Sequence, residues 1–593
     1  MPKQLTFRIA VHITPRLLIC YDQDILGEAT SITMSIKVAI IGAGPAGLVT
    51  LKTLLEASTP EQRIEACLFG AEADIGGTFN YRSHQNAELV SSKQLTTFSD
   101  HRLPLDRPDH ISLPEYVDYL RSYVAKFNLD THIKLNSPVI RVDRLPESSQ
   151  WILRVNYLDG TDSEDKQEKF YDCSHIAICT GLHVAPNIPT IPGIENVNGD
   201  VFHSSLYKDR SQVAGRNVLI LGCGETAMDI AYESIKADAQ SVTMCFRTGF
   251  LSFPKAVSGF QIFGKTFGGG LPIDGLIANL FETVYVHRAI ARSRLRYTSV
   301  VFRKSDWVEH SCSSTRVARQ CQTSTGPIKS TIRFWLVLGF DTLIRQKMPI
   351  PTESSILVHE YMDDSGRVHF QANPERKDWQ RLKNEVIKPD CVVYCRGYNQ
   401  HFPYLDSTYP TASDARIRNV IHPSHPDIAF VGFVRPGVGA IPPIAEQQSM
   451  WWTALITGKM VIPKYPPHYH LLAAKGSRIQ YGVDHSAYMG TLARDFGGAP
   501  GLMELYREHG LRMLLIYCFG ASFVTFFRLL GPFKSPVAPE IARTELAELI
   551  LRRGIAGNLF FGLVPMVFYG SINAVAFCIA LNWVDSRGEG GSV

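Results

Sequence analysis

The sequence predicts an α/β fold with two Rossmann-like domains and a helical C-terminal segment. A short β-branched segment that leads directly into a glycine-rich turn and then into a helical pattern occurs twice, once near residue 40 and once near residue 220. This order of strand, turn and helix is typical of the nucleotide-binding half of a doubly wound sheet. A chain of 593 residues also exceeds what one hydrophobic core usually supports, so several domains are expected.

The first copy starts with a strand at residues 37–41 and continues as a helix to about residue 57. Between them lies the turn Gly42-Ala43-Gly44-Pro45-Ala46-Gly47. The first glycine permits a tight turn, the second lets the backbone approach a pyrophosphate, and the third lets the helix pack on the strand. The amides at the start of the helix then face the phosphates. We therefore expect a dinucleotide to bind at Gly42, Gly44, Pro45, Ala46 and Gly47.

The second copy follows a strand at residues 217–221, and alanine replaces the third glycine, as the motif tolerates. The next strand, at residues 241–246, is followed by Arg247 where NAD-binding domains carry an acid. A guanidinium pairs with a 2′-phosphate that a carboxylate would repel, which favours NADP over NAD. The alternative is a solvated charge at the end of a strand. The predicted second set is Gly222, Gly224, Glu225, Thr226, Ala227 and Arg247.

Further glycines follow other predicted strands. Gly76-Gly77-Thr78 comes after the second strand, and Thr180-Gly181 ends a later one. Strand-end glycines let the backbone approach a flat cofactor, and a helix that starts near Ile444 would present its amides to the edge of such a cofactor. We add Gly76, Gly77, Thr78, Thr180 and Gly181 to the candidate cofactor-binding residues and assign no catalytic side chain.

The composition excludes several function classes. The 60 basic and 56 acidic side chains nearly balance, and no basic block is interleaved with aromatic residues, so we expect no nucleic-acid partner. The twelve cysteines form no CxxC pair, and the closest spacing, Cys391 and Cys395, fits neither a zinc ribbon nor a redox dithiol. No metal site is predicted.

The C-terminal end predicts contact with a membrane. Residues 555–584 contain no charged side chain, and roughly 20 apolar residues suffice to span a bilayer. Two arginines precede the run and acidic residues follow it, which places the large N-terminal part in the cytoplasm. Because Pro565, Gly570 and Asn573 interrupt the run, the alternative is a segment that lies in one leaflet. Residues 1–33 are expected to be an extension without a targeting role.

Together these motifs resemble the flavin-containing monooxygenases of class B, the dimethylaniline N-oxide-forming type, over residues 37–532. The most specific match is the stretch from Val197 to Lys208, which resembles the fingerprint FxGxxxHSxxYK with Val197 in place of the phenylalanine. Its Tyr207-Lys208 ending resembles the branch that oxidises heteroatoms. The segments Phe98-Ser99-Asp100 and Asp484-His485-Ser486-Ala487-Tyr488-Met489 also match the family, in family order.

The resemblance implies that FAD binds at the first turn and NADPH at the second. It implies a reaction in which O₂ forms a C4a-hydroperoxyflavin that gives one oxygen atom to a nucleophilic nitrogen or sulfur of a small molecule. The alternatives are a Baeyer-Villiger monooxygenase, which attacks ketones, and an uncoupled NADPH oxidase that releases hydrogen peroxide. It further implies the endoplasmic reticulum membrane, with catalytic domains facing the cytoplasm, and a possible homo-oligomer.

These expectations divide the chain into six parts. They are an extension at 1–33, an FAD-binding part at 34–204, an NADPH-binding domain with an insertion at 205–390, a second FAD-binding part at 391–470, a helical region at 471–550, and a transmembrane or membrane-anchoring helix at 555–584.

Three positions depart from the family pattern. Gly70 stands where the family has an acid that binds a ribose, so this hydrogen bond either comes from Glu72 or is missing. Val90 stands where the family has an asparagine beside the oxygen-reactive part of the flavin, and Ser91 or Ser92 is the expected substitute. Arg396 replaces a threonine in the segment Tyr394-Cys395-Arg396-Gly397, and the sequence assigns it no role.

Overall fold

The fold is taken from a computed structural model. The structure describes residues 34–145, 150–157, 167–245, 255–257, 260–262, 265–267, 270–275, 280, 354–355, 359–370, 384–437, 439–463, 469–470 and 481–575. The predicted extension at 1–33 and Arg247 lie outside these residues.

A six-stranded sheet forms the centre of the first domain, in the order β21-β22-β7-β1-β2-β3. Neighbouring strands are parallel except for β21 and β22. Val38, Ala39 and Ile40 in β1 are fully buried, which explains why this strand is a continuous apolar run rather than an alternating one. The strands are β1 (Met34–Ile41), β2 (Gln62–Phe69), β3 (Ile133–Lys134), β7 (His175–Ile178), β21 (Ile421–His422) and β22 (His425–Phe430).

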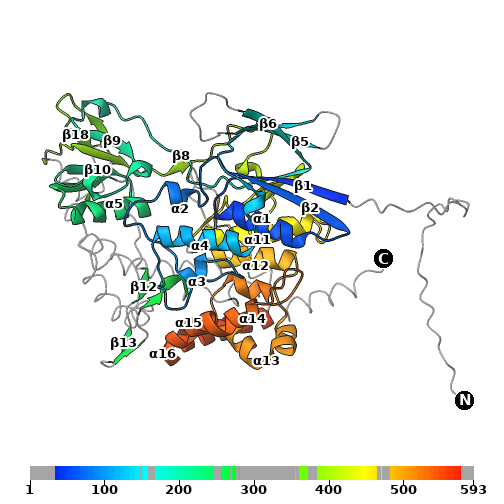
Figure 1. Cartoon of the computed structure of the whole chain (residues 1–593). Helices are drawn as coiled ribbons and strands as arrows, with labels where there is room; N and C mark the ends of the chain where they lie inside the picture. Colours follow the sequence, from blue (N-terminus) through cyan, green and yellow to red (C-terminus); the bar gives the residue numbers. More distant parts are fainter. Residues whose placement is uncertain are drawn as a thin grey trace, which may run out of the picture.

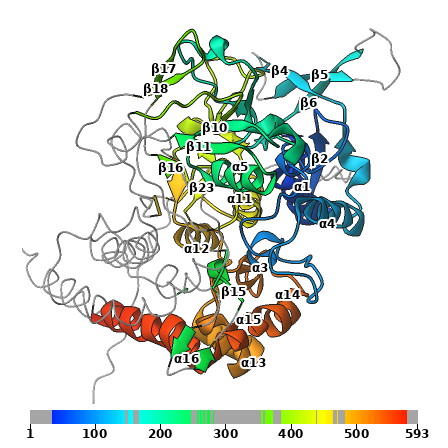
Figure 2. The ribbon, with the colours of Figure 1, turned by 90° about the vertical axis from the view of Figure 1, so that its left-hand side faces the viewer.

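The two faces of this sheet carry different layers (Figure 1). Helices α1 (Pro45–Ala57) and α11 (Ile441–Ile456) pack against each other on the face of Val38 and Ile40. The opposite face, with Ala39 and Ile41, packs against a three-stranded antiparallel sheet that contributes Trp151. That small sheet consists of β4 (Val139–Arg144), β5 (Trp151–Tyr157) and β6 (Gln167–Cys173), and Figure 2 shows it from the side.

A second parallel sheet, in the order β16-β11-β10-β19-β9, forms the other nucleotide-type domain. Helix α5 (Glu225–Lys236) covers it with Ala227 and Ile230, which are buried against Val218 and Ile220. Its strands are β9 (Asp200–His203), β10 (Asn217–Leu221), β11 (Ser241–Cys245), β16 (Ser354–Ser355) and β19 (Cys391–Tyr394). The predicted α/β fold with two Rossmann-type domains is confirmed.

The chain crosses between the two domains in both directions at one place. There β8 (Ala185–Pro186) pairs with β20 (Tyr398–Asn399) as an antiparallel ribbon. The first sheet takes strands from residues 34–178 and 421–430, on either side of the second sheet in sequence. The exact domain boundaries stay predictions.

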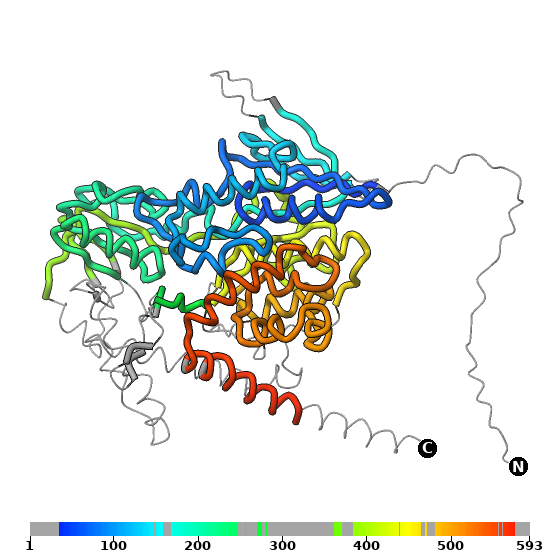
Figure 3. The backbone as a smooth tube through the Cα atoms, turned by 60° about the horizontal axis from the view of Figure 1, so that its bottom comes forward, coloured from blue at the N-terminus to red at the C-terminus, as the bar shows by residue number. Residues whose placement is uncertain are grey.

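The C-terminal region is a group of short helices that packs against α11 (Figure 3). Helix α13 bends at Gly510, whose φ of +80° is a conformation that favours glycine. The helices are α12 (His485–Asp495), α13 (Leu502–Phe519), α14 (Ala538–Ile541), the π-helical turn η9 (Ala542–Leu546) and α15 (Ala547–Arg552). Helix α16 (Gly554–Asn558) and the π-helical turn η10 (Leu559–Leu563) follow, and residues 564–575 continue as helix.

The structure describes only part of the predicted transmembrane segment. Among the described residues, no helix is both long enough and apolar enough to cross a membrane. Residues 576–584 of the predicted span lie outside the described part of the chain.

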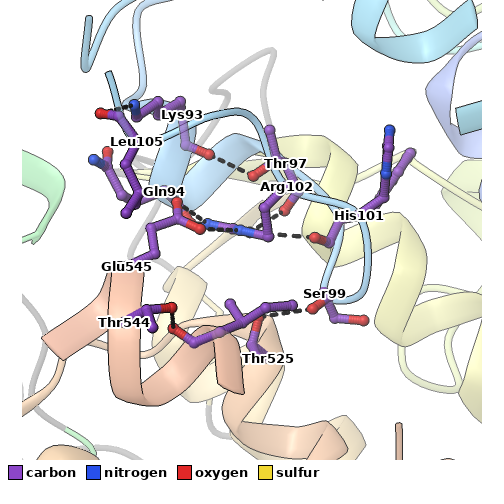
Figure 4. Close-up of polar contacts among 12 residues, drawn as sticks. Lys93, Gln94, Thr97, Ser99, His101, Arg102, Leu105, Thr525, Thr544 and Glu545 are labelled. Atoms are coloured by element: carbon purple, nitrogen blue, oxygen red, sulfur yellow. Dashed lines mark hydrogen bonds and ion pairs between the residues drawn. The ribbon is translucent and has the colours of Figure 1, made fainter. Parts of the chain in front are cut away.

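A buried ion pair attaches the C-terminal helices to the first domain (Figure 4). Nε of Arg102 donates to Oε2 of Glu545 over 2.7 Å, and Nη2 of Arg102 donates to Oε1 of Glu545 over 2.8 Å. The remaining guanidinium hydrogens are donated to the carbonyls of Gln94, Thr97 and Phe98. Since all five N–H donors of Arg102 have acceptors, the pair satisfies the requirement for a buried charge.

A second cluster, of four buried charged side chains, also joins the C-terminal region to the first domain. Lys52 of α1 binds Asp100, and NH2 of Arg528 lies 3.4 Å from the Asp100 carboxylate. NH1 of Arg528 also lies 3.3 Å from Glu446 of α11, whose Oε2 accepts the backbone N–H of Ser99 over 2.9 Å. All four charged side chains of this cluster are at most 5% exposed. Two acids and two cations therefore neutralise one another in the interior.

We expect Arg528→Gln to lower the free energy of unfolding by about 3 kcal/mol, because Glu446 would lose its cation while staying buried. Thermal or denaturant unfolding of the purified protein measures this. The exposed Arg507→Gln is the control and should change stability little. Equal stabilities of the two variants would contradict the prediction.

Candidate functional site

The turn after β1 has two glycines that the fold itself requires. Gly42 has φ +115°, and a Cβ added there would lie 2.7 Å from the carbonyl oxygen of Cys179. A Cβ on Gly47 would lie 1.9 Å from the carbonyl oxygen of Gly42. These two glycines therefore hold the turn, α1 and β7 in close contact, as the sequence pattern predicts.

Gly44 has no such packing reason. Its missing Cβ would meet only Cα of Gly77, 3.8 Å away, which is ordinary contact. Gly77 itself has φ +55° and precedes the short helix α2 (Thr78–Tyr81). Two glycine-rich turns thus face each other at the carboxyl edge of the first sheet, and the room beside them fits a pyrophosphate that approaches the backbone.

The other predicted residues of the first site lie around this edge. Pro45 and Ala46 are buried at the start of α1. The hydroxyl of Thr180 lies 3.4 Å from the hydroxyl of Tyr404, and Gly181 has φ +80° with open space beside it. The Glu72 side chain is exposed.

The turn after β10 repeats this design. Gly222 has φ +140°, and a Cβ there would lie 2.2 Å from the carbonyl oxygen of Cys395. Gly224 has no protein atom within 4 Å of its missing Cβ. Glu225 and Thr226 are exposed at the start of α5, whereas Ala227 is fully buried in the domain core. The room beside Gly224 fits a second nucleotide.

The residues that follow the Gly76-Gly77 turn contact the second domain. Nζ of Lys208 donates to the carbonyls of Tyr81 and Ser83, and the Lys208 carbonyl accepts the Gln85 backbone N–H over 2.8 Å. Nδ2 of Asn86 donates to Glu233 on α5 over 2.6 Å. Helix α2 and the residues after it are thereby fixed to the domain that carries the second glycine-rich turn.

The neighbouring His203 connects the ends of two adjacent strands in the second domain. Its Nδ1 accepts the Ser205 backbone N–H over 3.1 Å, so Nε2 carries the proton that is donated to the Gly397 carbonyl, just after β19, at 3.1 Å. Burial lowers the pKa of His203, which favours this neutral form. The sequence marked His203 and Lys208 only as parts of a fingerprint, and the contacts that these side chains make appear only in the structure.

Comparison with known families agrees with this geometry. The sequence model described as flavin-binding monooxygenase-like matches residues 35–325 and 382–548. The chain belongs to this family. Membership supports FAD and NADPH as the cofactors and makes the protein a monooxygenase-type oxidoreductase.

The monooxygenase is similar to proteins of the same size. It is 37% identical to "Monooxygenase PC-14" of Penicillium crustosum, over 90% of this chain and 96% of that protein. It is 26% identical to "Flavin-containing monooxygenase 1" of Rattus norvegicus, over 84% and 90% of the two chains. The structure of S-allyl-L-cysteine S-oxygenase from Allium sativum has the same fold, with a TM-score of 0.51 at 17% identity, over 88% and 98% of the chains.

The structure explains one departure of this monooxygenase from the family pattern. A Cβ on residue 70 would lie 2.8 Å from Cβ of Ala43 and 3.0 Å from Cδ2 of Leu135. Ala43 and Leu135 therefore occupy the space that an acidic side chain would need. Glycine at position 70 is a packing requirement of this chain.

The two serines after Val90, which were expected to replace the missing asparagine, lie in different environments. Val90 is 49% exposed and offers no polar atom. The Ser91 hydroxyl shares a hydrogen bond with Thr96 at 2.7 Å. Ser92 is fully buried, and its backbone N–H is donated to Oδ2 of Asp274 over 2.6 Å. Of the two serines, only Ser91 has a partly accessible side chain.

Asp274 was missed by sequence reasoning because a single acid between apolar residues gives no signal. It is 8% exposed, in the turn η5 (Ile273–Gly275). Burial raises its pKa to about 6. Arg552 and Arg553 donate to the carbonyls of Gly270 and Gly275 on either side, so α15 holds this turn against the Ser92 segment.

The raised pKa of Asp274 predicts a pH-dependent stability. The folded protein binds the proton more tightly than the unfolded chain, whose carboxyl keeps its ordinary value of 3.8. The contribution of Asp274 is therefore complete below pH 3.8 and is lost as the pH rises to about 6. Compared with Asp274→Asn, the native protein should lose stability over this interval in unfolding experiments. The exposed Asp106→Asn should follow the native profile, and a parallel profile for Asp274→Asn would contradict the assignment.

Proposed function

We propose that this protein is an FAD- and NADPH-dependent monooxygenase that transfers one oxygen atom from O₂ to a nucleophilic nitrogen or sulfur atom of a small molecule. The observation that carries the proposal is the pair of glycine-rich turns, with open space beside Gly224 and only ordinary contact at Gly44, in two domains that Lys208 holds together. Hydride transfer between two nucleotides depends on alignment, and a fixed arrangement of the two domains favours it.

The residues around each turn define which part would hold each cofactor. FAD would lie at Gly42, Gly44, Gly76, Gly77 and Thr78, and NADPH at Gly222 and Gly224. When bound, the flavin accepts hydride and supplies the oxygen activation. The protein contributes backbone amides for phosphates and a packed surrounding that limits the access of water.

One feature supports a heteroatom as the atom that is oxygenated. The Tyr207-Lys208 ending resembles the branch of the family that oxidises nitrogen and sulfur. Val90 supports the second candidate, an uncoupled NADPH oxidase, because its side chain provides no hydrogen bond beside the flavin.

Rapid mixing of the NADPH-reduced protein with oxygenated buffer tests both candidates. We expect a long-lived near-ultraviolet absorbance that belongs to neither oxidised nor reduced flavin, together with little hydrogen peroxide. Return to oxidised flavin with one peroxide per NADPH, whatever amine or sulfide is offered, would contradict the monooxygenase. Ester or lactone products from ketones would instead establish a Baeyer-Villiger enzyme.

Two glycine variants test which turn holds which cofactor. Gly44→Ala should reduce the flavin content of the purified protein, and Gly224→Ala should leave the flavin in place while weakening NADP⁺ binding roughly tenfold or more, because a methyl group fills space left for phosphate. Flavin absorbance and NADP⁺ titration measure the two effects. Loss of flavin from Gly224→Ala, together with retained flavin and weakened NADP⁺ binding in Gly44→Ala, would reverse the assignment.

We also propose that the C-terminal helix lies against the endoplasmic reticulum membrane, with the catalytic domains in the cytoplasm. Ile555 is 92% exposed, Leu559 53% and Val567 58%, and residues 554–575 carry no charge. An uncharged face with exposed large apolar side chains is typical of helices that rest in a membrane interface.

Flotation with phospholipid vesicles tests this placement. The double variant Ile555→Glu/Val567→Glu should reduce the vesicle-bound fraction severalfold, because two carboxylates would have to enter the interface. Val461→Glu, at an 83% exposed side chain outside this helix, is the control. Unchanged flotation of the double variant would refute the proposed surface.

A further inference from the structure

Arg396 follows the strand that lies beside the second glycine-rich turn. β19 and β10 are parallel, with Leu221 opposite Tyr394, and the Cys395 backbone N–H is donated to the Leu221 carbonyl over 3.0 Å. The next residue on β10 is Gly222, whose missing Cβ faces the Cys395 carbonyl. Arg396 therefore begins at the same carboxyl edge of the sheet as the turn that starts α5.

The first domain contains a segment equivalent to the one that carries Arg396. There Cys179-Thr180-Gly181 follows β7, and the Cys179 carbonyl faces the missing Cβ of Gly42. In the second domain Cys395-Arg396-Gly397 follows β19 in the same relation to Gly222. The final glycines have φ +80° and +72°. The two domains thus share this backbone arrangement. Between the cysteine and the glycine, the first domain has the neutral Thr180 and the second domain has the cationic Arg396.

The backbone of Arg396 is held in place from two directions. Nδ2 of Asn187 donates to the Arg396 carbonyl over 3.3 Å, and the Asn187 backbone N–H is donated to the Gly397 carbonyl over 2.9 Å. The Gly397 carbonyl also accepts Nε2–H of His203. Such a fixed backbone reduces the conformational freedom that the arginine must lose when it binds a ligand.

The guanidinium of Arg396 interacts electrostatically with the second glycine-rich turn. Burial raises the pKa of Cys223, the residue between the two glycines, and the Arg396 guanidinium opposes this by favouring the thiolate. The same turn presents Gly224, which has open space beside it, and the uncapped first amides of α5. A guanidinium, free amides and unfilled space together favour a phosphate group.

We propose that Arg396 binds the pyrophosphate of the dinucleotide at the second turn, an addition that rests on NADPH binding there as proposed above. The equivalent position of the first domain holds the neutral Thr180. The arginine adds a charge-assisted contact at the nucleotide that must bind from solution and be held during oxygen chemistry. It acts on the pyrophosphate, which NADP⁺ and NAD⁺ share, and therefore strengthens binding of both.

Equilibrium titration of the oxidised, flavin-loaded protein with NADP⁺ and NAD⁺ tests the assignment. Arg396→Thr, which copies the first domain, should raise both dissociation constants by roughly 10- to 100-fold, as expected for loss of a charged hydrogen bond. Arg396→Lys should retain part of the affinity, and the exposed Arg416→Gln should bind like the native protein. Flavin absorbance, unchanged in every variant, reports that the proteins are folded.

Three outcomes would overturn the assignment. If Arg396→Thr bound both nucleotides with native affinity, the role proposed for Arg396 would be refuted, whereas NADPH binding at the second turn would stand. Loss of NADP⁺ affinity with NAD⁺ affinity unchanged would assign the arginine to the 2′-phosphate instead of the pyrophosphate. Failure of the native, flavin-containing protein to bind NADP⁺ would overturn this assignment together with the proposed function.

Discussion

The buried cluster of Lys52, Asp100, Glu446 and Arg528 is the interaction on which the arrangement of the molecule depends. Its four buried charges connect α1, the loop after α3 (Lys93–Thr96), α11 and the C-terminal region at one place in the interior. Although burial opposes ionisation of Asp100, the neighbouring Lys52 and Arg528 lower its pKa, whereas burial and the Asp100 charge raise the pKa of Glu446. Buried charges are costly when one partner is removed, so the cluster specifies one docking of the helices.

That docking matters because α11 and α1 both begin at the carboxyl edge of the first sheet, where the glycine-rich turns lie. α1 starts directly after Gly44, and α11 comes in sequence after β22, the strand on the other side of β7 from β1. The cluster fixes these helices in the interior, and the contacts of Lys208 fix the second domain to the residues at and after α2. The position of each turn is therefore set by interactions far from it in sequence, which suits chemistry that depends on alignment of two nucleotides.

The departures from the family pattern have different physical origins. Glycine is required at position 70 by the packing of Ala43 and Leu135, so this departure is a local change in packing. Val90 leaves a partly exposed apolar side chain, and its neighbour Ser92 is held by Asp274, a residue on a distant turn. Arg396 adds a charge to a backbone arrangement that the chain uses twice. A substitution within a motif thus has to be interpreted from its neighbours.

The sequence by itself determined the two strand–turn–helix units, because glycine spacing and short-range apolar patterns are local properties: β10 spans Asn217–Leu221 and α1 ends at Ala57, as the pattern predicts, although α1 already begins at Pro45, inside the predicted turn. It also identified the family, since several motifs occur in order. Only the tertiary structure showed that Lys208 joins the domains, that Asp274 holds Ser92, and that Arg396 lies beside Gly222, because each contact joins residues more than a hundred positions apart, and chain spacing carries no information about such distances.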